Sequence, residues 1–111
     1  MRYVEANLGV SVADAESVTL RFEARTLLLA FVDWQEQPRS LVFHDVLAHR
    51  WQELDEAVPR DDTTFEVVES PWLARQAELQ AVQSEDYAHY LLCFNACGAL
   101  DVLARRLDAS G

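Results

Sequence analysis

The sequence predicts an α+β domain with a mostly antiparallel, partly curled β-sheet of five or six strands and one helix at about residues 71–82. Three observations support this fold class. Apolar and polar residues alternate in several short runs, which is typical of half-buried strands. A helix-start signal stands at Ser70-Pro71. The connections are too short for repeated crossover helices, which excludes an all-parallel α/β sheet.

Strands dominate the first half of the chain. Between Ser17 and Ala24, Val18, Leu20 and Phe22 alternate with polar residues, and the apolar run Leu27 to Trp34 follows a tight turn near Arg25. A turn at residues 37–40 then leads into a strand at residues 41–43. The period of residues 44–51 is ambiguous between a helical face and a broken strand, and we favour the strand with a break.

The second half contains the helix. Residues 63–69 form a strand, and Ser70 and Pro71 have the residue types that favour the N-cap and the first helical position. The helix runs through Trp72, Leu73, Gln76 and Leu79, with polar positions between them, so Trp72, Leu73 and Leu79 supply the expected apolar face. Strands at residues 89–94 and 100–104 around a turn at residues 95–98 complete a hairpin.

Length and composition indicate a single globular domain over residues 1–111, with residues 1–16 and 106–111 less ordered. The N-terminal residues lack the apolar core of a signal peptide, no apolar stretch is long enough to span a membrane, and two cysteines are too few for a disulfide framework. We therefore expect a cytoplasmic protein that does not bind membranes.

The chain is strongly acidic. Its 19 Asp and Glu residues against 9 basic residues, all of them Arg, give a formal net charge of -10. This balance argues against nucleic-acid binding, because affinity for phosphate backbones comes from cations that release condensed counterions. The same charge would attract a basic protein partner at long range.

The strongest candidates for a metal-binding or catalytic site are three residues: His44, Asp45 and His49. Imidazole and carboxylate groups suit a metal site or an acid–base pair. In a regular helix or strand, however, residues five positions apart point in different directions, so only a bulge would bring both histidines together. A metal-dependent or small-ligand-binding enzyme using His44 and Asp45, with His89 as a further ligand, is the alternative functional hypothesis.

Cys93 and Cys97 leave three interpretations open: a metal site with His89, a reversible disulfide across the turn, or a buried thiol at Cys93 with an ordinary turn residue at Cys97. Catalytic motifs are missing from the sequence. It has no G-x-S-x-G elbow, no glycine-rich phosphate loop and no lysine for a Walker motif. We therefore expect no catalytic residues, no resident metal and no cofactor.

An acidic segment is the candidate partner-binding surface. Glu53, Asp55, Glu56, Asp61 and Asp62 follow closely after Trp51. Such a run is typical of a solvated loop, but beside an exposed tryptophan it would form a binding site flanked by charge. Self-association as a homo-oligomer, through an exposed edge strand and surplus aromatic residues, is a further possibility.

Four strings of residues carry a resemblance to known proteins: Phe43 to Val46, Ser70 to Leu73, His89 to Asn95 and Gly98 to Val102. On these strings the chain, from about Ser17 to Leu107, resembles small uncharacterised bacterial proteins, some of them similar to immunity proteins encoded beside toxins. The resemblance implies a small bacterial cytoplasmic protein that is not an enzyme and binds another protein. It implies no functional residue.

Overall fold

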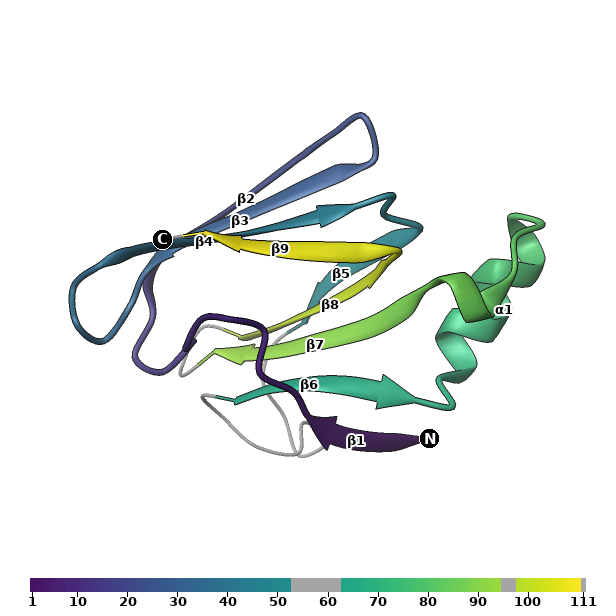
Figure 1. Cartoon of the computed structure of the whole chain (residues 1–111), viewed down its shortest axis with the longest axis horizontal. Coiled ribbons are helices and arrows are strands. Elements are labelled where there is room, and N and C mark those ends of the chain that lie inside the picture. The colour runs from purple at the N-terminus through teal and green to yellow at the C-terminus, as the bar shows by residue number, and fades with distance from the viewer. Residues whose placement is uncertain (53–62, 95–97, 111) are drawn as a thin grey trace.

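The computed structural model describes residues 1–52, 63–94 and 98–110 and contains two antiparallel sheets and one α-helix within these ranges (Figure 1). The first sheet has five strands in the order β1 (Arg2–Glu5), β6 (Thr63–Val68), β7 (Ala88–Phe94), β8 (Gly98–Ala104) and β5 (Ala48–Gln52). The second has four strands in the order β2 (Glu16–Glu23), β3 (Thr26–Val32), β4 (Pro38–His44) and β9 (Arg106–Ser110).

One corner joins the two sheets. β4 continues into β5 through residues 45–47, and β8 continues into β9 through Arg105. Backbone hydrogen bonds carry the ladder across this corner, from Leu47 N to the Leu103 carbonyl at 2.7 Å and from Arg105 N to the His44 carbonyl at 3.0 Å. The two sheets therefore diverge from a shared bent ribbon, as the wedge shape in Figure 1 shows.

The main core fills the space between the sheets. Alternate residues of β7 and β8, including Leu92 and Val102, point toward β3 and β4, whose Leu29 and Phe43 are fully buried. Because side chains alternate along a strand, the residues between them lie on the opposite face of the five-stranded sheet. That face carries His89, Asp101 and a smaller apolar cluster that includes Leu91.

Helix α1 (Pro71–Leu79) begins where its sequence predicts. The Ser70 side chain accepts a hydrogen bond from Leu73 N at 3.1 Å and so caps the helix. Trp72 and Leu73 pack against a buried cluster that contains Leu103, and a short 3₁₀ helix, η1 (Ser84–Asp86), follows. The expected apolar face is correct at Trp72 and Leu73, whereas Leu79 is 69% exposed.

Two hairpin turns are built from residues in the left-handed region. Ala24 and Arg25 have φ values of 51° and 64° and form the two-residue loop between β2 and β3, which confirms the tight turn near Arg25. Between β3 and β4, the turn lies at residues 33–37 and is organised by Asp33, whose Oδ1 accepts from the amides of Gln35 and Gln37 at 2.9 Å.

The coarse prediction of a mostly antiparallel domain with one helix is confirmed, and the details differ. The described residues form two sheets and nine strands, where one sheet of five or six strands was predicted. Residues 38–40, predicted as a turn, are the first residues of β4, because Arg39 pairs with Phe31. The break predicted between residues 44 and 51 is confirmed at the corner. β1 and β9 lie in segments for which the sequence predicts no strand.

Candidate functional site

The sandwich is open where the edge strands β2 and β5 face each other. Leu20 and Phe22 of β2 lie on the core side of their sheet, beside the buried Leu29 and Leu27, yet they are 38% and 49% exposed. The ring of Phe22 packs on that of His49 in β5, with 4.9 Å between the ring centroids. We call Leu20, Phe22, His49 and Trp51 the edge surface.

Trp51 is the anchor of the edge surface. Its ring stacks on the buried Phe94 at 5.6 Å between centroids, and 40% of the residue remains exposed. Gly98 permits this position, because a Cβ atom there would lie 2.8 Å from Trp51 Nε1 and 2.7 Å from the Gln52 carbonyl oxygen. The indole is therefore held in one orientation with one side toward solvent, which suits a binding residue.

The other predicted partner-binding residues fall outside the described ranges. These are Glu53, Asp55, Glu56, Asp61 and Asp62. They begin one residue after Gln52, the last residue of β5, so in the sequence they continue directly from the strand that carries Trp51.

The candidate residues His44, Asp45 and His49 do not come together. His44 Nε2 lies 2.8 Å from Asp108 Oδ2, Asp45 Oδ2 lies 3.6 Å from Arg105 Nε, and His49 belongs to the edge surface. Within the described ranges, no group of three or more His, Cys, Asp or Glu side chains is placed to hold a metal ion. Cys93 is fully buried, as a core thiol would be, whereas Cys97 lies outside the described residues.

Beneath helix α1 lies a polar network that the sequence analysis does not predict. His89 Nε2 lies 2.6 Å from Asp101 Oδ1, and His89 Nδ1 lies 2.7 Å from Ser70 Oγ. All three residues are buried, with exposed fractions of 7% for Ser70, 3% for His89 and 2% for Asp101. Since a carboxylate can only accept, His89 donates from Nε2, and in the neutral ring Nδ1 accepts from the Ser70 hydroxyl.

The second carboxylate oxygen of Asp101 is also bonded. It accepts from Gln52 Nε2 at 2.7 Å and from Arg50 Nε at 3.2 Å. The Arg50 guanidinium stacks over the Trp72 ring at 4.1 Å, and the Trp72 ring meets the His89 ring edge-on at 5.2 Å. Donors from β5 and β7 therefore surround the buried carboxylate, which satisfies its charge.

Ser70, His89 and Asp101 have the residue types of a nucleophilic triad, but their geometry favours a structural role. The Ser70 oxygen already accepts from Leu73 N and is hydrogen-bonded to His89 Nδ1, and the residue is almost completely enclosed. A nucleophile must instead present its oxygen to a substrate next to oxyanion donors. The network joins the start of α1 to β7 and β8 and so fixes the helix on the sheet.

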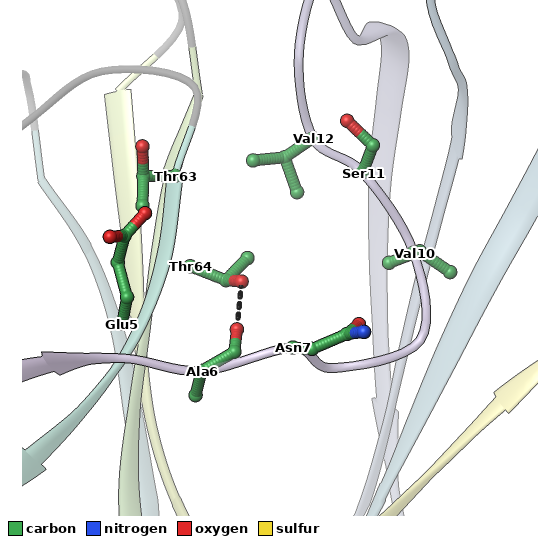
Figure 2. Close-up of a pocket in the computed structure, with 8 residues that line it drawn as sticks. All are labelled: Glu5, Ala6, Asn7, Val10, Ser11, Val12, Thr63 and Thr64. Atoms are coloured by element: carbon green, nitrogen blue, oxygen red, sulfur yellow. Dashed lines mark hydrogen bonds between the residues drawn. The ribbon is translucent and has the colours of Figure 1, made fainter.

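An open pocket of about 420 Å³ lies between residues 5–12 and the start of β6. Figure 2 shows the residues that line it. The Thr64 hydroxyl donates to the Ala6 carbonyl oxygen at 2.6 Å, and Asn7 Oδ1 accepts from Gly9 N at 2.9 Å. These polar groups are used to hold the chain as it crosses between the sheets. The lining residues include neither histidine nor a cationic side chain, so the pocket offers little to bind an anionic ligand.

No protein-family model, curated protein or solved structure matches this chain. The resemblance to immunity-type proteins therefore stays a prediction. Within the described ranges, α1 is too short to cross a membrane. The edge surface is the candidate functional site, because it exposes rigid aromatic area at an open edge of the sandwich.

Proposed function

We propose that this chain is a non-enzymatic, cytoplasmic bacterial binding protein, of the immunity-like kind, that engages a basic protein partner. The observation that carries the proposal is the half-exposed, rigidly held Trp51 at the open edge of the sandwich, on the same strand as His49, on which Phe22 packs. Tryptophan and other aromatic residues dominate the binding energy of protein interfaces when their orientation is fixed in advance.

Charge supports the choice of partner. With a formal net charge of -10, the protein attracts a cationic surface and repels other acidic proteins and nucleic acids. The acidic segment 53–62 begins two residues after Trp51 in the sequence. In this proposal Trp51 supplies affinity, and Glu53, Asp55, Glu56, Asp61 and Asp62 accelerate association, since exposed charges act mainly on the on-rate.

The experiment compares two tryptophans. A protein captured from extract of the native host is purified, and its binding to the wild type, Trp51→Ala and Trp34→Ala is measured. Trp34 is 58% exposed but lies in the turn between β3 and β4, so it serves as the control. We expect a basic captured protein, a Kd at least about tenfold higher for Trp51→Ala, and a change below about twofold for Trp34→Ala.

A second variant tests the charge. Neutralising Asp55, Glu56, Asp61 and Asp62 to Asn and Gln should slow association, most strongly at low ionic strength, where screening is weakest. A partner that binds Trp51→Ala and the neutralised variant as well as it binds the wild type would exclude this surface and the proposed function with it.

A further inference from the structure

The longest edge strand among the described residues, β2, offers its backbone as well as its side chains. β2 has eight residues, against four in β1 and five each in β5 and β9, the other three strands that end a sheet. Among the described strands only β3 pairs with β2. Figure 1 shows β2 as the outermost strand of its sheet.

β2 lacks most of the devices that protect an edge. Proteins usually cover such strands or interrupt them with bulges, prolines or inward-pointing charges. In β2 the register shift lies at one end, between Glu16 and Thr19, and the turn at Ala24 lies at the other. The five residues between, Thr19 to Glu23, pair in regular register with β3, and five residues is a common strand length.

The side chains of this stretch face two environments. Leu20 and Phe22 belong to the edge surface, whereas Thr19, Arg21 and Glu23 alternate with them and point to the other side of the sheet. An added strand would therefore meet apolar side chains on one face and, on the other, polar side chains that include the ion pair of Arg21 and Glu23. Cross-strand pairs of this kind stabilise sheet pairing.

Charge decides whether the strand added to β2 comes from a second copy of this chain or from a basic partner. A second copy of this chain would bring another net charge of -10 against the first, which opposes pairing of β2 with β2. An extended segment rich in basic residues is attracted by the same charge. The strand that fits this edge therefore alternates apolar residues with arginine or lysine.

We infer that β2 binds its basic partner by strand addition, pairing residues 19–23 with an extended segment of the partner that alternates apolar and basic residues. This inference rests on the proposed function and specifies how the partner is held. Backbone hydrogen bonds give affinity in this mode, and alternate side chains give specificity. Leu20 and Phe22 would lie beside the apolar residues of the added strand, on the same face of the sheet.

The test uses two synthetic peptides of alternating arginine and valine, identical except that one is N-methylated at every amide. Both carry the same charge, but only the unmethylated peptide can donate backbone hydrogen bonds. We expect the unmethylated peptide to bind at least about tenfold more tightly and to slow amide exchange at alternate residues of Thr19 to Glu23. Phe22→Ala should weaken binding, whereas Leu28→Ala, a 36% exposed residue on the opposite face of the same hairpin, should not.

Equal binding of the two peptides would overturn strand addition while leaving a charge-driven interaction intact. Exchange protection on β1, β5 or β9 in place of β2, or absence of binding at millimolar peptide, would also overturn it. The proposed function is tested separately through Trp51 and the captured protein, so the two can fail independently.

Discussion

The imidazole of His89 and the carboxylate of Asp101 form a buried hydrogen bond of 2.6 Å between neighbouring strands. Both residues point to the sheet face that α1 covers, and Ser70 at the N-terminus of the helix bonds the other ring nitrogen. The contact therefore couples helix and sheet through polar groups that have left water. Removing one member leaves the others buried with unsatisfied hydrogen-bonding groups, which is the costly case.

Asp101→Ala should lower the free energy of unfolding by about 3–5 kcal/mol, because His89, Gln52 and Arg50 all lose their acceptor. Chemical denaturation measures the change. Asp108→Ala is the matched control. Asp108 also bonds a histidine, His44, but its side chain is 68% exposed, so its removal should cost about 1 kcal/mol or less. Equal losses of free energy of unfolding for the two variants would contradict the prediction that the buried aspartate contributes more than the exposed one.

Ser70 has two roles that two substitutions can separate. Ser70→Ala removes the helix cap, worth about 1 kcal/mol, and the partner of His89 Nδ1, worth about 1–3 kcal/mol. Glycine at an N-cap costs only a few tenths of a kcal/mol, so Ser70→Gly largely spares the cap but still removes the partner of His89 Nδ1. Its free energy of unfolding should therefore fall by most of the amount seen for Ser70→Ala. Denaturation of both variants, with Ser84→Ala as control, tests this. Near-wild-type stability of Ser70→Gly would mean that the histidine contact contributes little.

Local sequence signals predict the parts of the fold that form locally. Ser70 and Pro71 start the helix, and alternation in residues 17–24 marks β2. β1 and β9 depend on partners distant in sequence, since Tyr3 pairs with Val67 and Leu107 with Phe43. Their own residues are mostly polar or exposed. The sequence of each segment therefore cannot be told apart from that of a frayed chain end.

The candidate site was predictable only in part. The sequence predicts Trp51 as a partner-binding residue, but Phe22, which packs on His49 of the same strand, comes from the opposite sheet, and the sequence contains nothing that relates β2 to β5. The polar network left a weak signal: His89 and Asp101 interrupt otherwise apolar strands, and a hairpin of β7 and β8 brings them to one face. Ser70 joins them only through tertiary packing.

A substitution in the turn between β2 and β3 should stabilise the protein. Ala24 and Arg25 both adopt positive φ, which costs an L-residue other than Asn, Asp or Gly about 1 kcal/mol or more. Replacing the pair with Asn-Gly should raise the free energy of unfolding by about 1–2 kcal/mol. Arg25→Ala, which keeps the strained backbone, is the control and should give no gain. The Arg25 carbonyl, which accepts Val46 N at 2.8 Å, is retained in both variants.

Asp33 makes stability depend on acid pH. The Arg39 side chain, followed by the amides of Gln37 and Gln35, lowers the pKa of its carboxyl below 3.8. A lowered folded-state pKa stabilises the fold above the unfolded-state value and loses this contribution as pH falls through the folded-state pKa. Asp33→Asn should therefore be less stable at neutral pH and lose less stability below pH 3.8. Denaturation midpoints measured across this range test the prediction, and parallel curves for the two proteins would contradict it.

Tyr90 makes stability depend on alkaline pH. Burial against the Phe43 ring, 5.7 Å away between centroids, and then the charge of Glu66 raise the pKa of its phenol above 10.0. The neutral phenol therefore stabilises the fold below pH 10.0, and this contribution is lost as pH rises through the higher folded-state pKa. Glu66→Gln should lower the pKa of Tyr90 only partway toward 10.0, because burial is the larger cause. The tyrosinate absorbance of Tyr90, isolated by subtracting a Tyr90→Phe titration, measures it. Complete return to the ordinary value in Glu66→Gln would make the carboxylate, and not burial, the dominant cause.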